Sequence, residues 1–476
     1  MTPRVRAFLS PIVYFSSNWI SLTGVVLVTT AAVFWLFLLP SGFALETHNP
    51  YTGILTFIML PAVFFTGLAL IPLGIWLSWR HANRGGTFPK VLPSLDFTNV
   101  RLRRLVIFVL VTTCVNIVIA GHTTYTAVEY MDSVTFCGLT CHTVMQPEYT
   151  AYQNSPHSRV ECVKCHIGPG ASWFVKSKIS GARQLIAVAL KTYERPIPVP
   201  VRNLRPSRDT CETCHWPQRF GGERLRVISK YADDETNTKT TSVLMVHIGG
   251  GETHRGIHGV HMGPGVVITY AHADEKRNTI PWVRVENSGK QPVEFIADGT
   301  KPGAWNQMAQ RTMDCMDCHN RPTHTYELPD RGMDRVINEN PQIATLPFLK
   351  KKGVEILKAS YKTRDEAQRA IPAAIDGYYK QSYPAIYGQR AGDIKAASEA
   401  VTSVYDRNMF PEMNVNWGTY TNNIGHTDFT GCFRCHDDLH AAGGGKKITQ
   451  DCSACHELLA MDEANPKVLK DLGMAK

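Results

Sequence analysis

The sequence has almost no cysteine outside one short pattern, and it shows no internal repeat beyond that pattern. Of its 13 cysteines, 12 form six pairs, and no pair lacks a histidine directly after it. The absence of a longer repeat excludes solenoids and other repeat architectures. The absence of histidine-free pairs argues against zinc, because zinc sites usually share one ion between two pairs. It also argues against dithiol redox chemistry, whose motif would occur once, beside a βαβ pattern.

The pairs follow the pattern of covalent haem attachment. Five read Cys-x-x-Cys-His, in which two thiols bind the vinyl groups of one haem and the adjacent imidazole reaches the iron. The sixth pair, Cys137 and Cys141 before His142, has three spacer residues instead of two. The sequence therefore predicts six covalent c-type haems. The cysteines expected to hold them are Cys137, Cys141, Cys162, Cys165, Cys211, Cys214, Cys315, Cys318, Cys432, Cys435, Cys452 and Cys455, and the motif histidines are His142, His166, His215, His319, His436 and His456.

Three apolar runs precede the first pair. The runs at about 20–39 and 53–79 are long enough to cross a bilayer as helices, with two prolines in the second tolerable as kinks. The third, at about 105–125, is shorter in strictly apolar residues, and a buried core helix is the alternative. Its position just before the first haem motif favours a third transmembrane helix. The remaining cysteine, Cys114, lies inside this run and is expected to act as a small hydrophobe.

Charge in the loops predicts the orientation. The N-terminus carries Arg4 and Arg6, and the loop after the second run carries six further Lys or Arg residues. The loop between the first two runs has neither. The positive-inside rule then puts the N-terminus in the cytoplasm and everything after about His122 on the periplasmic side of a bacterial inner membrane. A cleavable signal peptide is not expected, because the first run begins late and lacks a small-residue cleavage site.

Four regions are expected. They are a membrane domain at 1–120, a region with motifs 1–3 at 121–220, a β-rich insertion at 221–312, and a region with motifs 4–6 and a helical insertion at 313–476. The predicted fold class is a multihaem cytochrome c, mainly α with little regular structure, because macrocycles replace side chains as core. Alternating or apolar runs bounded by Gly and Asn predict strands at 225–231, 242–247, 266–271 and 280–285. A 3.6-residue period predicts helices at 348–361, 364–379 and 392–406.

Low-spin electron-transfer haems need a second axial ligand, usually His or Met. The sequence has 18 histidines, of which six close motifs, so 12 remain. Those near motifs are His157, His324, His426 and His440. At least one of His258 and His261, in the β-rich insertion, is expected to be a ligand, whereas His247, His254 and His272 are weaker candidates. The sequence does not say which histidine serves which iron.

Part of the chain resembles a known family. Phe136–Met145, Glu148-Tyr149, Ser155–His157, Cys162–His166 and Trp173–Gln184, followed by Cys211–His215, are similar to the NapC/NirT family of membrane-anchored quinol dehydrogenases. The resemblance covers about 105–220. The later stretches 313–324 and 425–440 resemble longer multihaem members that feed extracellular electron transfer. The family typically has one anchor helix and four haems, so three helices and six haems are departures.

The resemblance implies a quinol site beside the first haem. In the family a Met just after the first motif can ligate the iron, which leaves Met145 and His142 as alternatives here. A Lys near the quinol corresponds to Lys176 or Lys178. The family's acidic position falls at about Gln184, which cannot take a proton, so Glu129 or His122 are the substitutes.

The expected function is oxidation of menaquinol or another quinol, with electrons passing along the haems to periplasmic cytochromes or reductases. The chain would then be a quinol:cytochrome c-type oxidoreductase. The main alternative is a haem relay subunit of a larger membrane complex, without a quinol site. A catalytic reductase and a haem-based sensor are less favoured, because no motif His is replaced by Lys and the cytoplasmic segments are too short for an output domain. No nucleic-acid partner is expected, because much of the formal charge of +9 comes from the cytoplasmic arginines.

Overall fold

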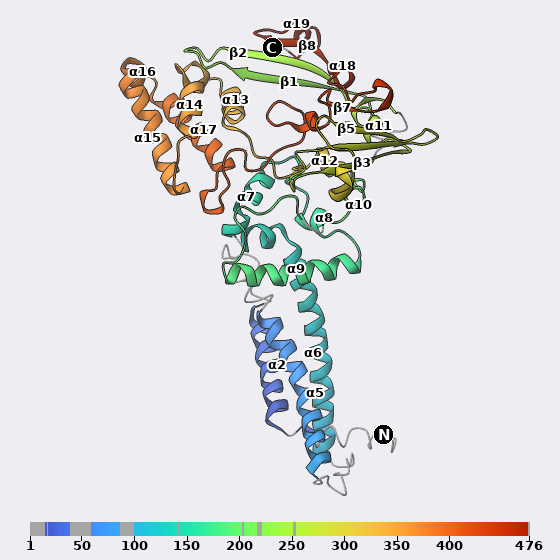
Figure 1. Ribbon diagram of the computed structural model, residues 1–476. Helices are drawn as coiled ribbons and strands as arrows, with labels where there is room; N and C mark the ends of the chain where they lie inside the picture. The colour runs from blue at the N-terminus through green and yellow to red at the C-terminus, as the bar shows by residue number, and fades with distance from the viewer. Residues whose placement is uncertain are drawn as a thin grey trace. The chain divides into compact units, whose positions relative to one another are not determined.

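The computed structural model describes residues 15–16, 18–38, 59–85, 100–140, 142–201, 204–216, 221–250 and 254–474. The chain divides into two compact units, residues 1–141 and 142–476. The first unit is helical, whereas the second combines helices with two sheets, as the ribbons in Figure 1 show. The division falls between Cys141 and His142, inside the first cysteine motif.

Three helices make up the described part of the first unit: α2 (Trp19–Leu38), α5 (Leu60–Gly85) and α6 (Val100–Asp132). A short π-helix, η2 (Phe136–Thr140), follows α6. Helices α2 and α5 approach closely where two glycines meet, because a Cβ added to Gly67 would lie 2.8 Å from the backbone oxygen of Gly24. Small residues of this kind let helix backbones pack tightly, which is a common device in membranes.

The prediction of three membrane-spanning helices is supported for one of them. Within the described residues, α5 is the helix whose length and composition suffice to cross a membrane, and α2 contributes a shorter apolar stretch, Trp19–Phe34. The second apolar run is predicted at 53–79, whereas α5 runs from Leu60 to Gly85. The helix therefore includes basic residues at its end instead of stopping before them. Helix α6 forms over the third run, yet charged residues at both of its ends extend it beyond an apolar span. The basic N-terminus and Lys90 lie outside the described residues.

The second unit carries short helices around the cysteine motifs. They are α7 (His142–Gln153), α8 (Cys162–His166), α9 (Ala171–Ala189), α10 (Ser207–Cys211), α11 (Gly256–Met262), α12 (Cys315–Cys318), the 3₁₀-helix η7 (Gly431–Arg434), α18 (Cys452–Cys455) and α19 (Lys467–Asp471). Each Cys-x-x-Cys-His motif thus contains or adjoins at least one helical turn.

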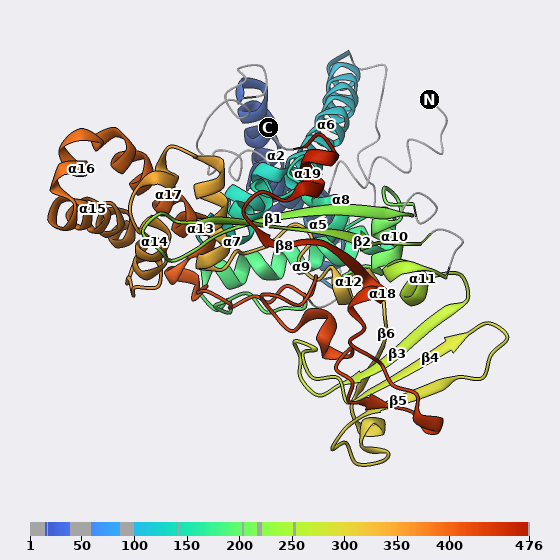
Figure 2. The same ribbon diagram turned by 90° about the horizontal axis from the view of Figure 1, so that it is seen from above.

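Two antiparallel sheets follow the first three motifs. The strands are β1 (Glu223–Tyr231), β2 (Lys239–His247), β3 (Val266–His272), β4 (Trp282–Asn287), β5 (Val293–Ala297), β6 (Ala309–Thr312), β7 (His440–Ala441) and β8 (His456–Glu463). One sheet has the order β1-β2-β8 and the other β6-β3-β4-β5-β7. Figure 2 shows β8 running along β2. The four predicted strands are confirmed, but both sheets are completed by strands from the C-terminal region, which the sequence did not indicate.

The helical insertion forms a layer of its own from α13 (Pro329–Glu339), α14 (Leu349–Leu357), α15 (Arg364–Ser382), α16 (Pro384–Gln389) and α17 (Ala391–Asn408). The three helices predicted here are confirmed. Their apolar faces enclose a large side-chain core that includes Met333, Leu357, Tyr379 and Tyr405. Ordinary apolar side chains therefore supply the core of this region.

The glycine contact between α2 and α5 generates a prediction. Gly67→Leu should separate the two helices, because its side chain has no room beside Gly24, and overpacking of this kind costs about 1–3 kcal/mol. Hydrogen–deuterium exchange of the purified protein in detergent should then be at least about fivefold faster in α2 and α5. The matched control is Gly121→Leu in α6, where an added Cβ meets no described atom within 4 Å. Equal exchange in both variants would contradict the account.

Candidate haem-binding centres

The local backbone brings the three haem-binding side chains of a motif to one face. In three motifs the histidine N–H closes a helical turn onto the first cysteine, with N···O distances of 2.8 Å for His215 to Cys211, 2.8 Å for His319 to Cys315 and 3.1 Å for His436 to Cys432. Residues i, i+3 and i+4 of such a turn point the same way. Two thiols and one imidazole can therefore meet one haem.

Five of the motif histidines face a second histidine from elsewhere in the chain. The ring-centroid distances are 5.8 Å for His215 and His157, 6.3 Å for His166 and His324, 6.2 Å for His319 and His258, 5.8 Å for His436 and His261, and 6.3 Å for His456 and His426. The structure thus pairs each of these motifs with one distal histidine. All five distal residues are among those singled out in the sequence.

The spacing of these pairs fits one iron between two imidazoles. Two rings bound to one metal from opposite sides, each through a bond of about 2 Å, would have centroids roughly 6 Å apart. Each Cys pair adjoins its motif ring, as thioether attachment requires. The residues present therefore fit haem c at motifs 2 to 6.

Hydrogen bonds and burial prepare the rings for binding iron. Nδ1–H donates to a backbone carbonyl in His261 (to Ile257, 2.7 Å), in His436 (to Thr449, 3.0 Å) and in His324 (to Glu148, 2.9 Å). The Nε2 lone pair of each ring is then free for a metal. Burial also lowers the pKa of several rings, which favours the neutral form that metals bind; these are His166, His258, His261, His319 and His324.

The first motif differs in backbone as well as in sequence. Cys137 lies in the π-helix η2, where each turn contains about one residue more than in an α-helix. One extra residue per turn matches the one extra spacer residue of this motif. Cys141 lies outside the described residues, as does the side chain of His142. Met145 is half-buried on α7.

His440 does not fit the ligand role expected for it. Its ring is buried and uses both nitrogens, with Nδ1 at 2.8 Å from Asp437 Oδ1 and Nε2 at 2.7 Å from the backbone oxygen of Ile280. No lone pair is left for a metal. Of the weaker candidates, His247 contacts Glu223 and His272 contacts the backbone of Asp274.

Contacts between motifs follow the order of the sequence. Helix α10 of motif 3 contacts both α8 of motif 2 and α12 of motif 4, where Cys211 and Cys315 lie side by side. Cys318 of motif 4 lies close to Cys432 of motif 5. Cys455 of motif 6 also lies close to Cys432, so motif 6 is a neighbour of motif 5. Motifs 2 to 6 thus form one chain of neighbours.

Helix α11 holds two adjacent centres at once. His258 and His261 are three residues apart, so they project from neighbouring positions on one face of the helix. They face His319 of motif 4 and His436 of motif 5, respectively. The sequence predicted at least one ligand in Gly-Ile-His-Gly-Val-His but not that this segment forms a helix, and both of its histidines face a motif histidine.

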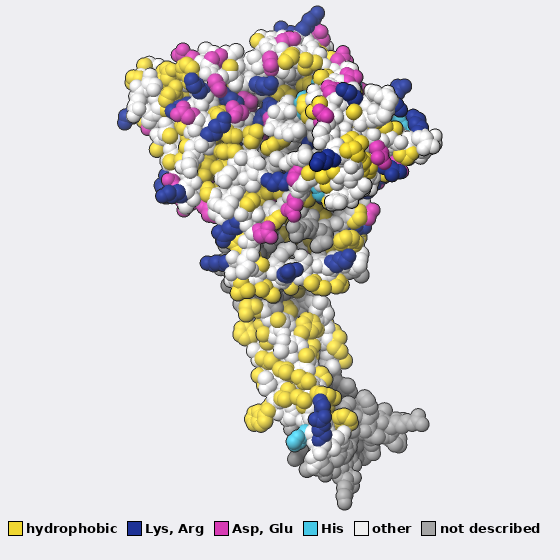
Figure 3. All heavy atoms as spheres, viewed as in Figure 1, with side chains coloured by type: hydrophobic (Ala, Val, Ile, Leu, Met, Phe, Trp, Pro, Cys, Tyr) yellow, Lys and Arg dark blue, Asp and Glu magenta, His cyan; other side chains and the backbone are white. Residues whose placement is uncertain are grey.

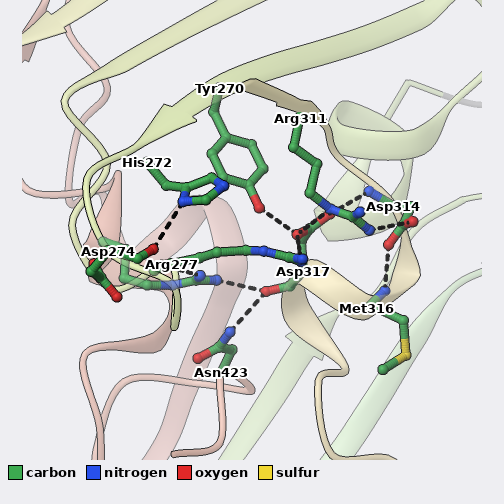
Figure 4. Close-up of polar contacts among 10 residues, drawn as sticks. Tyr270, His272, Asp274, Arg277, Arg311, Asp314, Met316, Asp317 and Asn423 are labelled. Carbon is green, nitrogen blue, oxygen red and sulfur yellow. Dashed lines mark hydrogen bonds and ion pairs between the residues drawn. The ribbon is translucent and has the colours of Figure 1, made fainter. Parts of the chain in front are cut away.

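A spacer residue of motif 4 fastens that motif to the second sheet. Asp317 is buried, and its carboxylate accepts from Arg277 Nη1 (3.2 Å), Arg311 Nε (3.0 Å) and the Tyr270 hydroxyl (Figure 4). Its backbone oxygen accepts from Arg434 Nη2 at 2.6 Å, and Arg434 is a spacer residue of motif 5. Asp317 therefore links the two neighbouring motifs to each other and to β3 and β6. Nothing in the spacing of the motif indicated this role.

A second buried ion pair positions a distal ligand. The Arg321 guanidinium lies 3.1 Å from Glu148 Oε2, donates to the His324 backbone oxygen at 2.7 Å and lies 4.2 Å from the centroid of the Tyr420 ring. Glu148 in turn accepts the Nδ1–H of His324 at its backbone oxygen. Arg321 and Glu148 thus fix the ring that faces His166. The sequence drew attention to Glu148 only through the family resemblance, and it missed Arg321.

The residues expected near a quinol lie on two helices. Lys176, Lys178 and Gln184 are all on α9, and Gln184 donates to Ser180 of the same helix. The two lysines are two residues apart, so they point in different directions and cannot both enter one site. His122 and Glu129 are both exposed on α6, and their seven-residue spacing puts them on one face of that helix. They are the candidate residues of the proposed quinol site.

Comparison with known proteins gives the class and then the family. Over 464 residues the chain is 41% identical to the cytochrome c-type protein ImcH of Geobacter sulfurreducens (strain ATCC 51573 / DSM 12127 / PCA), covering 95% of this chain and 91% of that protein. Residues 100–197 match the model of the NapC/NirT cytochrome c family, N-terminal region. No solved structure matches the chain. The protein is therefore a c-type cytochrome with covalently bound haem c. It belongs to the NapC/NirT family, whose members are anchored in membranes and transfer electrons.

Loss of one distal histidine should affect one centre. His258→Ala removes the ring that faces His319, so that iron should become high-spin or bind water, while haem content by the pyridine haemochrome assay stays unchanged. Electron paramagnetic resonance of the oxidised holoprotein would show this. His254→Ala is the control, because His254 faces no motif histidine in the described structure. An unchanged low-spin spectrum for His258→Ala would contradict the pairing.

The buried pair should also matter for stability. Arg321→Met leaves the Glu148 carboxylate buried without its partner, which should destabilise the fold by about 3–5 kcal/mol. The same change in Arg331, whose partner Asp428 is 36% exposed, should cost about 0–1 kcal/mol. Guanidinium unfolding followed by far-ultraviolet circular dichroism compares the two. Equal losses would argue against a special role of Arg321.

Proposed function

We propose that this protein oxidises a membrane quinol and passes the electrons along six haems to periplasmic redox partners. The observation that carries the electron-transfer part is the set of five facing histidine pairs, arranged as neighbours in sequence order. Two histidines at each of these five irons would leave no open position there, which suits electron transfer and disfavours a catalytic reductase at these centres. Bound haem c would supply one-electron redox chemistry at each centre.

The quinol part of the proposal rests on the family. NapC/NirT cytochromes interact with quinol and with redox partners at the membrane. In this chain, Lys176 or Lys178 would bind a quinol oxygen, and Glu129 or His122 would accept its proton. One quinol releases two electrons and two protons, so a proton acceptor is required beside the electron acceptor. Gln184 can contribute a hydrogen bond but no proton transfer.

We also propose three membrane spans with the haem-bearing unit in the periplasm. Helices form within all three apolar runs, and basic residues lie at the end of α5 and at the start of α6. Electrons would leave near motifs 5 and 6, the last two motifs in the row of neighbours. Soluble cytochromes or reductases could approach there.

The second candidate function is a relay subunit of a larger membrane complex. The exposed apolar side chains of α6, such as Ile117 and Val118, would suit a protein neighbour as well as lipid. A relay subunit would accept electrons from another subunit and would need no quinol site. Its histidine pairs would be the same, so only quinol chemistry separates the two functions.

Anaerobic mixing with a menaquinol analogue tests the proposal. The purified holoprotein, with all six haems present, should be reduced, as followed in the haem absorbance band. No reduction under these conditions would contradict the quinol dehydrogenase and favour the relay subunit.

Substitution of the lysines sharpens this test. Either Lys176→Ala or Lys178→Ala, but not both, should slow reduction by the quinol about tenfold, because a charged hydrogen bond of about 1.5 kcal/mol is lost. Lys395→Ala in α17 is the control, since Lys395 pairs with Glu399 on the same exposed helix face. Unchanged rates in both α9 variants would remove the lysines from the site.

A further inference from the structure

Helix α9 exposes an unusual amount of apolar surface. Its six large aliphatic or aromatic side chains with high exposure are Phe174 (37%), Val175 (53%), Ile179 (67%), Leu185 (38%), Ile186 (61%) and Leu190 (68%), the last of them at the helix end. Single exposed apolar residues are normal on soluble proteins, but a continuous patch marks an interaction surface.

These side chains lie on one side of the helix. At 100° per residue they occupy roughly half of the circumference. Lys176, Arg183 and Gln184 lie on the other half. Val188, just outside the apolar sector, is the residue that packs against the buried cluster around Phe410. The apolar side is therefore not the side by which α9 joins the rest of its unit.

The charges of α9 all have one sign. Ala171–Ala189 contains Lys176, Lys178 and Arg183 and no acidic residue, and Lys191 follows directly. Figure 3 shows basic side chains beside apolar ones along this stretch of the surface. Lys178 projects from the apolar sector, and its ammonium lies 4.9 Å from the centroid of the Phe174 ring. A lysine in this position can lay its alkyl chain on apolar surroundings and still reach a charged layer.

We propose that α9 lies in the headgroup layer of an anionic bilayer, with its apolar side in the acyl boundary. An exposed apolar face with exclusively basic flanks is the pattern of helices that lie on membranes. Each Lys or Arg near an anionic surface adds about 1 kcal/mol of attraction. A soluble protein partner would need complementary polar contacts, and the apolar side offers only Lys178 for them.

This placement deepens the proposed function. It brings Lys178 to the depth at which a quinol headgroup resides, whereas Lys176 would face away from the acyl layer. Membrane contact of α9 rests on the family's membrane anchoring but not on quinol oxidation. Contact and oxidation can therefore fail separately in experiments.

Lipid-borne photolabelling tests the contact directly. The full-length holoprotein is reconstituted into vesicles of phosphatidylglycerol and phosphatidylethanolamine that contain a phospholipid with a diazirine near the start of its acyl chain. After illumination, peptide mapping should find lipid adducts on the segment 174–190, and α15, whose apolar face is buried in the core of the helical insertion, should carry none. Adducts on α5 confirm that reconstitution succeeded.

Two matched variants decide the outcome. Ile179→Glu places a charge in the apolar side and should lower the adducts on α9 at least fivefold, while Ser180→Glu adds the same charge on the polar side and should leave them unchanged. Haem content is checked in both, so that a misfolded variant is recognised. Adducts on α5 but none on α9 in the unsubstituted protein would overturn the proposal, as would equal labelling of α9 in both variants. Lost quinol oxidation with retained labelling would overturn only the proposed function.

Discussion

Most of the second unit depends on one constraint. In each of five pairs, two imidazole rings face each other at a distance that leaves room for one metal atom. Each pair joins a cysteine motif to a histidine supplied by another element, so five such pairs tie together segments that are far apart in the sequence. His324, for example, reaches back to a motif that ends at His166. A metal bound between two rings acts as a cross-link, and the unit should be far less ordered without it. The motif segments depend on these cross-links, whereas the helical insertion has an apolar core of its own.

Ion pairs supply the rigidity that the short motif helices lack. Asp317 gathers two arginines and a tyrosine behind motif 4, and Arg321 fastens the ring that faces motif 2. Both hold a ligand segment in place by buried, charge-assisted hydrogen bonds, which are the strongest that side chains form. A chain of closely spaced centres requires such support, because distances between them must not vary.

The attachment sites were readable from the sequence because thioether chemistry demands fixed local spacing. The helices and first strands were readable for a similar reason, since their periodicity is local. The pairing of distal histidines was not, because His258 and His261 belong to motifs that follow them by about 60 and 170 residues in the sequence. His440 was misjudged because proximity to a motif does not reveal that both nitrogens are hydrogen-bonded. Strands β7 and β8 escaped notice for the same reason, as their partners lie some 140 to 220 residues away.

The ligands of all six irons can be counted in one measurement. Near-infrared magnetic circular dichroism of the oxidised holoprotein distinguishes iron with two histidines from iron with histidine and methionine, and from high-spin iron. The account predicts five centres with two histidine ligands each, with only the first centre free to differ. A spectrum in which two or more centres lack a second histidine would contradict it.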